Sequence, residues 1–554
     1  MKKYFSLCLI FILSFIINTK VLAASINLSD LSNIKTYEQS DFNTFLNDYN
    51  NNNLDDIYIT KFLFDGVGMY KPYDLDDFIE SGNDFVVEPL EITVINLNSL
   101  DDTTFTGELS GGMIAVNTNN KSGNINIILN NVKLDTDSKK IPVIYIYNKD
   151  ITSTNVKVTI KTLENTNNYL EGGKLKKVSL MPSDGLSSYT NKYSGTNSTN
   201  FTSYTNYYGV YNSSQIKKIL FATVNADNED LSDGDPVNYY KASGAISSDI
   251  DLYFEGTGYL EVTSKNKEGV ETKGNLTFSG GTGDYVINAQ DDCLNTTTDS
   301  KEINNARNTL TIDVNSMYAI VSLDADEGDA IDSNGTLIIN GGTIVAASYP
   351  GSDAGIDSEN GIFINGGTVL ATGDMYDQIM NTSKQNYMVF SFNSSIEEDT
   401  LITMLDSSNN PIFSYKTDRT YTNLIYSNSN LSGTYYLYKD GSIKGNNTNG
   451  FYTKISKYTK GTMLGYSNTG VNMGGPTMNR NNNQAISTSS NEFKVDAISN
   501  QFSGISEYSN TNNILTSNST INAYLYIGIG IIVTSIILLI ILILIRRKNT
   551  KEVA

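Results

Sequence analysis

Acidic residues recur at matching positions of a short repeat, and they are the strongest candidates for chemistry in this sequence. Three segments align without gaps, beginning at Gly269, Ala330 and Gly355, and weaker copies begin at Ala245 and Cys293. If the copies stack as parallel strands about 4.8 Å apart, carboxylates at equivalent positions repel by roughly 1 to 4 kcal/mol, depending on the local dielectric. We expect no Lys or Arg to compensate these columns. A hard cation with oxygen ligands would convert the repulsion into coordination, and Ca²⁺ suits such an irregular site better than Mg²⁺.

The stacked positions predict a set of metal ligands. These are Asp291, Asp292, Asp326, Asp329, Asp332, Asp353, Asp357 and Glu271. Zn²⁺ is disfavoured, because the chain has no His and only two Cys. An EF-hand loop beginning at Asp324 is excluded, since its last position, which requires a bidentate Glu, is Gly335. The competing interpretation is that these Asp and Asn residues only form turns.

The composition excludes several classes of protein. The 554 residues include 39 basic and 60 acidic side chains, for a net charge of −21 and a pI near 4.5. This balance argues against nucleic acid as a partner, because phosphate backbones require a basic surface. The absence of His excludes Ser–His–Asp and Cys–His catalysis. Cys8 lies in the apolar N-terminal segment, so Cys293 would be alone in the mature chain and could form no internal disulfide.

Apolar segments near both ends predict export and anchoring. Residues 1–23 combine Lys2 and Lys3 with an apolar run and small residues before Ala24, which is typical of a signal peptide. Residues 523–545 are apolar and are followed by three basic residues, which predicts a transmembrane helix and a cytoplasmic tail at 546–554. We therefore expect a single-pass type I protein of the cell membrane with a large extracellular N-terminal part.

The repeat also predicts how the central region folds. Successive copies start 24, 24, 37 and 25 residues apart, and apolar residues within a copy alternate with the period of a strand. One copy, with two or three strands and a Gly-Gly turn, cannot bury its apolar side alone, so the copies should stack. This predicts an all-β parallel β-helix over residues 99–380, with a β-sandwich as the main rival.

Composition divides the rest of the chain. Residues 24–98 have no assignable fold, and residues 165–240 are rich in Ser, Thr, Asn and Tyr, which predicts a surface insertion of low regularity. Short strand-like runs predict a small antiparallel β module at 381–460. Residues 461–522 predict a flexible stalk.

One coil of the repeat carries a resemblance to a known family. Gly328-Asp329-Ala330-Ile331-Asp332, followed by Ile339-Asn340-Gly341-Gly342-Thr343 and echoed at Gly366-Gly367-Thr368, resembles the bacterial carbohydrate-binding-domain-containing family. The similarity extends over about residues 100–440, with departures at Cys293 and in the long insertion. The resemblance implies a right-handed, calcium-binding, pectate-lyase-like parallel β-helix solenoid. It also implies surface proteins that bind cellulose or acidic sugars such as pectin, with Ca²⁺ ligands among the coil aspartates.

The first functional hypothesis is a membrane-anchored cell-surface protein, not an enzyme, that binds plant-type or acidic polysaccharide with the help of Ca²⁺. Because the chain has no Trp, tyrosines must supply any sugar-stacking surface, and the outward candidates are Tyr253, Tyr259, Tyr285, Tyr318 and Tyr349. One alternative is a pectate-type lyase on the same fold, with Lys273 or Lys301 as the base. The other is a surface adhesin or structural protein without specific sugar binding.

Overall fold

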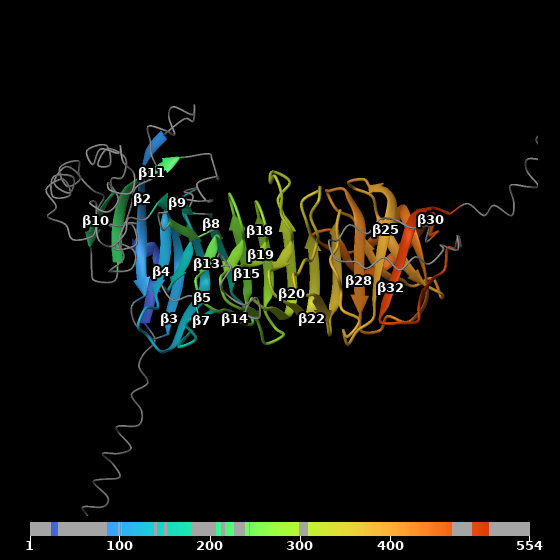
Figure 1. Ribbon diagram of the computed structural model, residues 1–554, viewed down its shortest axis with the longest axis horizontal. Coiled ribbons are helices and arrows are strands. Elements are labelled where there is room, and N and C mark those ends of the chain that lie inside the picture. Colours follow the sequence, from blue (N-terminus) through green and yellow to red (C-terminus); the bar gives the residue numbers. More distant parts are fainter. Residues whose placement is uncertain are drawn as a thin grey trace, which may run out of the picture.

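The computed structural model shows an elongated all-β protein whose strands cross its long axis (Figure 1). Strands β2 and β11 lie towards one end of this body and β30 lies near the other. The structure describes residues 24–31, 86–97, 100, 102–137, 141–148, 152–173, 175–179, 207–211, 216–225, 239–242, 244–297, 308–467 and 490–508. Helical structure in these residues is confined to the 3-10 turn η1 (Leu28–Leu31).

Each coil of the central region contributes strands to three faces, which surround a shared apolar core. The first face contains β7 (Val156–Thr162), β14 (Leu252–Gly256), β17 (Leu276–Phe278) and β23 (Ile362–Ile364). The second face contains β8 (Asn167–Gly172), β15 (Tyr259–Ser264), β18 (Asp284–Ala289) and β24 (Thr368–Gly373). The third face contains β2 (Val86–Leu97), β4 (Gly112–Asn117), β6 (Ile144–Tyr147), β13 (Ile246–Ser248), β16 (Val270–Thr272), β19 (Leu294–Thr296) and β21 (Ile331–Ser333).

Alternating side chains determine which side of each face is buried. In β15, Leu260 and Val262 are fully buried, whereas the intervening Glu261 is partly exposed. The inward residues form one core cluster, in which the ring of Phe254 stacks on that of Phe278 at 4.4 Å and Tyr285 meets Phe278 edge to face at 5.0 Å. Strand-period alternation in the sequence therefore produces a continuous interior.

Equivalent residues of successive repeats lie side by side, as the alignment predicts. Val270 pairs in parallel with Ile246 on one side and with Leu294 on the other, and Leu294 pairs with Ile331. The predicted Gly-Gly turn forms the corner between the first and second faces. There Gly367 has a φ of 87°, and a Cβ would lie 2.4 Å from the carbonyl oxygen of Gly342 in the preceding coil. Only glycine fits this close approach.

Four long strands pass through this corner without a break and belong to both faces. They are β3 (Thr103–Ser110), β5 (Gly123–Asp135), β20 (Leu310–Val321) and β22 (Leu337–Ala347). As a result, the pairing closes on itself through eight parallel strands in the order β5, β7, β14, β17, β20, β18, β15, β8 and back to β5. Register shifts within β20 and β22 mark the bend.

This closed ring corrects the predicted fold class. The repeats predict a parallel β-helix, and the family resemblance implies a right-handed, pectate-lyase-like one. In such a solenoid the ladder of each face would run separately. Instead, β5 and β20 join two ladders at their ends, so the hydrogen-bonded strands form a closed parallel barrel of eight members. Periodicity identifies strands and their stacking, but it does not show whether a strand continues through a corner.

The predicted membrane anchor is also corrected. Across the part of the chain that the structure describes, no helix has the length and hydrophobicity that a bilayer crossing requires. The predicted signal peptide at 1–23, the predicted span at 523–545 and the tail at 546–554 lie outside the described residues. The described residues therefore contain no helix that supports the predicted single-pass type I localisation.

Segments from the unassigned N-terminal region and from the predicted insertion extend the coils. Strand β1 (Ala24–Asn27) pairs in parallel with β3, and β2 pairs with β4. Within the predicted insertion, β10 (Tyr207–Tyr211) and β11 (Ile216–Asn225) form an antiparallel pair that continues the third face through β2. Two further strands, β9 (Leu175–Ser179) and β12 (Tyr239–Ala242), pair with each other. Strand β8 also falls within the predicted insertion, yet it is a regular member of the second face.

An antiparallel module follows the coils and covers part of the second face. It contains β25 (Tyr387–Ile396), β26 (Ile402–Asp406), β27 (Pro411–Tyr415), β28 (Tyr421–Asn428), β29 (Gly433–Thr448), β30 (Phe451–Gly465), β31 (Phe493–Val495) and β32 (Ser499–Glu507). Its core includes Tyr318, Val345 and Leu370 from the outer side of β20, β22 and β24. Within the predicted stalk at 461–522, the end of β30 and the whole of β31 and β32 belong to this module.

Candidate functional site

The stacked third face brings the acidic positions of successive repeats into register. Asn295 pairs with Glu271 in the preceding coil and with Asp332 in the following one. In β21 the flanking Ile331 and Ser333 are fully buried, so the alternation of the strand turns Asp332 away from the core. The backbone N–H of Asp357 donates to the carbonyl of Ile331, which holds the next coil beside Asp332.

Three carboxylates converge at this place. One oxygen each from Asp329, Asp332 and Asp357 lies within 4.8 Å of the other two, and all three side chains are half-buried. Asp329 accepts a hydrogen bond from the backbone N–H of Ala354. The backbone N–H of Asp329 donates in turn to Oδ1 of Asp292 at 2.8 Å. We call Asp329, Asp332 and Asp357 the aspartate trio.

Burial and mutual repulsion disfavour the ionised form of these groups. Burial, with smaller contributions from Asp357 and Asp332, raises the pKa of Asp329 to about 8. Burial and the neighbouring Asp357 raise the pKa of Asp332 to about 7. Burial and then Asp332 also hold the pKa of Asp292 well above its usual range. A cation among these oxygens would favour the charged carboxylates instead.

The donor set fits a hard divalent cation. The trio offers only carboxylate oxygens, which the fold holds close together, and none of its three residues is basic. Such oxygens, at half-buried positions, suit Ca²⁺, which accepts irregular all-oxygen coordination. Asp329, Asp332 and Asp357 would hold the ion, which would supply a positive charge for anionic ligand groups.

Two other predicted ligands, Asp291 and Glu271, have partners outside the trio. Asp291 pairs with Nζ of Lys267 at 2.7 Å, and the same ammonium lies 3.4 Å from Glu327. Lys267 stands in the column of Asp291, one repeat earlier, so the expectation that no base occupies these columns is wrong. Glu271 is 1% exposed and accepts a hydrogen bond from the hydroxyl of Ser247 at 2.8 Å.

The remaining candidates are Asp292, Asp353 and Asp326, and they differ in burial and in hydrogen bonding. Both oxygens of Asp292 accept hydrogen bonds, one from the backbone of Asp329 and one from the amide of Asn295. Asp353 is half-buried, and burial raises its pKa. Asp326 is exposed. The structure thus brings together three of the eight predicted ligands, with Asp292 as their hydrogen-bonded neighbour.

The predicted tyrosines occupy different environments. The expectation of an outward side chain is wrong for Tyr285, which is 1% exposed within the coil core, and the antiparallel module covers Tyr318. Tyr349 packs against the coil core. Tyr253 is half-buried beneath Nζ of Lys157, which lies 4.4 Å from its ring centroid. Tyr259 lies on the open part of the second face, beside a residue that the sequence reasoning missed.

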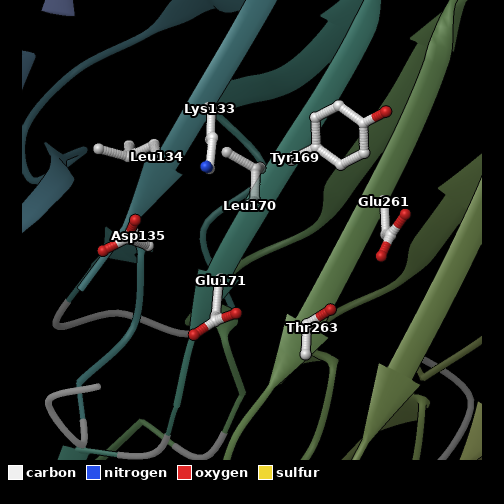
Figure 2. Close-up of a pocket in the computed structure, with 8 residues that line it drawn as sticks. All are labelled: Lys133, Leu134, Asp135, Tyr169, Leu170, Glu171, Glu261 and Thr263. Carbon is white, nitrogen blue, oxygen red and sulfur yellow. The ribbon is translucent and has the colours of Figure 1, made fainter. Parts of the chain in front are cut away.

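That missed residue is Tyr169 of β8, which is 43% exposed. It lines a groove of about 360 Å³ on β5, β8 and β15 (Figure 2). Its signal was present in the sequence, because Asn168 and Leu170 point inward and Tyr169 and Glu171 must then point outward. Assigning residues 165–240 to an irregular insertion concealed this alternation.

The lysines considered as catalytic bases receive no support from the geometry. Nζ of Lys273 lies 3.0 Å from the carboxylate of Asp249, in an ion pair of low exposure. Such a partner keeps an ammonium protonated, whereas a proton-abstracting lysine must be neutral. Lys301 lies outside the described residues.

Comparison with protein families agrees in part with the predicted resemblance. Residues 209–389 match the model of a family described as carbohydrate-binding domain-containing protein. This segment includes the whole aspartate trio and the coils from β13 to β24. Neither curated proteins nor solved structures provide a match. Over this segment the chain is therefore similar to carbohydrate-binding domain-containing proteins.

Proposed function

We propose that this protein binds saccharides and that the aspartate trio holds Ca²⁺ for the recognition of acidic sugars. The family match over residues 209–389 is the observation that carries the saccharide part. The calcium part is supported by the three converging carboxylate oxygens within that same segment.

The physical argument for calcium is the cost of the trio without it. Burial, and to a smaller extent repulsion from the neighbouring carboxylates, raises the pKa of Asp329 to about 8, so that charging the trio without a cation is unfavourable. A divalent cation would compensate two of the three negative charges. It would also keep coordination positions open towards solvent, because Ca²⁺ takes six to eight oxygen ligands and the trio offers one oxygen from each of three carboxylates. A uronate carboxylate is the sugar group that such an ion attracts most strongly.

Retention on polygalacturonate tests the proposal. The full-length chain is expected to be retained in millimolar Ca²⁺ and released when EGTA replaces it, whereas Mg²⁺ should not restore retention because it demands a stricter octahedral site. Equal retention in EGTA would overturn the calcium part. Failure to retain the chain on any polysaccharide of a broad panel would overturn saccharide binding altogether.

The same incubation distinguishes binding from cleavage. Unsaturated uronates absorb in the near ultraviolet, so a lyase would produce a rising trace with soluble polygalacturonate. We expect a flat trace, because Lys273 is paired with Asp249.

A further inference from the structure

The groove around Tyr169 lies on three parallel strands in register. Tyr169 of β8 pairs with Lys133 of β5 on one side and with Glu261 of β15 on the other. One step along the strands, Glu171 occupies the corresponding position between Asp135 and Thr263. Figure 2 shows these side chains on the three neighbouring strands, with the ring of Tyr169 between Lys133 and Glu261. The groove is therefore a product of strand register.

Buried residues beneath the groove hold it in shape. Leu134 and Leu170 are 0% and 1% exposed and belong to the coil core. Asn168 is also fully buried, and its amide donates to the carbonyl of Tyr259 at 3.0 Å while its oxygen accepts from the backbone N–H of Val132 at 3.1 Å. These bonds connect β5, β8 and β15, so the groove is preformed.

Tyr169 gives the groove an aromatic wall, and Tyr259, which is outside the lining, contacts its ring. The ring centroids of Tyr169 and Tyr259 are 5.9 Å apart, with their planes inclined by 60°. The hydroxyl of Tyr259 donates to Glu261 at 2.8 Å, which fixes the orientation of both side chains. Tyr169 remains 43% exposed, so its ring is available to the apolar C–H face of a sugar.

The outer row containing Tyr169 changes character along the second face. From Glu261 it continues through Val286, Tyr318, Val345 and Leu370. The last three of these belong to the core shared with the antiparallel module. Where the protein covers this face with its own chain, the outer row is apolar. Around Tyr169 the row is charged and aromatic, which suits a small polar ligand better than a further protein layer.

The charges of the groove select among sugars. Its lining carries the carboxylates of Asp135, Glu171 and Glu261 against the single ammonium of Lys133. Outside the lining, Nζ of Lys265 lies 3.4 Å from Glu171. Carboxylates accept hydrogen bonds from sugar hydroxyls, but they repel the carboxylates of uronates.

We propose that this groove binds a neutral, hydroxyl-rich segment of a glycan chain, independently of calcium. One pyranose stacks on Tyr169, and its hydroxyl groups donate to Glu261 and Glu171. The inference rests on the proposed saccharide binding, but it assigns a second site with the opposite charge preference from the aspartate trio.

Titration calorimetry of the full-length chain in EGTA tests this site. Cellohexaose is the neutral probe and hexagalacturonate is the anionic probe of equal length. We expect the wild-type chain to bind cellohexaose and to bind hexagalacturonate at least about tenfold more weakly. Tyr169→Ala should weaken cellohexaose binding about tenfold or more, and Tyr169→Phe should restore most of it, since it keeps the ring.

Two further variants make the outcome decisive. Ile498→Ala removes an exposed side chain of the antiparallel module and should leave both affinities unchanged. Glu261→Gln should reduce the difference in affinity between cellohexaose and hexagalacturonate, because it removes a negative charge that repels uronates. Unchanged cellohexaose binding by a folded Tyr169→Ala chain would overturn the groove assignment while leaving saccharide binding intact. Preferential binding of hexagalacturonate in EGTA would overturn the charge argument. Failure of the wild-type chain to bind any saccharide, in EGTA and in millimolar Ca²⁺ alike, would overturn the proposed function as well.

Discussion

The aspartate trio and the Tyr169 groove both arise from parallel strands stacked in register, yet their surfaces differ in charge and in residue type. In the trio, successive coils place Asp beside Asp. In the groove, register places Lys133, Tyr169 and Glu261 side by side on three strands. Acidic residues in register concentrate negative charge, which a bound cation would compensate. Residues of different type in register produce a mixed surface that suits hydroxyl groups. Small departures from a repeat can thus change the ligand class without changing the backbone.

Both regions rest on one core, and Phe254→Ala tests that premise with the largest expected effect. Phe254 is fully buried and stacks on Phe278, and its ring also meets that of Tyr285 at 6.1 Å. Removing the ring should cost about 3 to 5 kcal/mol of unfolding free energy, measured by urea denaturation. Phe254→Leu is the matched control and should cost less than about 1.5 kcal/mol. A loss below about 1 kcal/mol for the alanine variant would show that the coils do not share a tightly packed interior.

Calcium should bind the aspartate trio and not the Tyr169 groove, and its effect on stability should be smaller than that of Phe254→Ala. A saturating cation at about 100 times its Kd would add about 2.7 kcal/mol to the wild-type chain, seen as a rise in melting temperature. Asp332→Asn should abolish this rise. In EGTA the variant should melt no lower than wild type, because the amide relieves repulsion from Asp357.

Asp440→Asn provides the control for that experiment. Asp440 is an exposed residue of β29 in the antiparallel module with a φ of 64°, a conformation that Asn also adopts readily. This variant should keep the full calcium response. An equal calcium response in Asp332→Asn and wild type would exclude the trio as the binding site.

The sequence predicted the register of the trio because the repeats align there without gaps. That alignment placed Asp332 beside Asn295, and the strand pairing confirms it. The alternation within β18 could also have placed Tyr285 correctly, since it shares its side of the strand with the buried Ile287. The burial of Tyr318 could not be predicted from the local alternation of residues, because a later segment of the chain covers this side chain.

Other features depended on information that periodicity lacks. The closure of eight strands into a ring follows from β5 and β20 continuing through a corner, which no residue in the pattern marks as a break or a continuation. The groove was missed because β8 was assigned to an irregular insertion. Local strand alternation was therefore a better guide than composition at Tyr169.

Lys265→Gln should have the smallest effect on stability, and it tests whether charge beside the groove sets the preference for neutral sugars. The ion pair with Glu171 has a separation of 3.4 Å, and both side chains are well exposed, at 52% and 37%. Exposed pairs of this kind contribute less than about 1 kcal/mol, so unfolding by urea should change only slightly. The loss of a positive charge beside the groove should weaken hexagalacturonate binding further while cellohexaose binding stays within about twofold. Lys161→Gln is the matched control, because Lys161 forms an ion pair of equal separation with Glu255 on the first face and should alter neither affinity. A gain in hexagalacturonate affinity for Lys265→Gln would contradict the view that charge in the groove sets its preference.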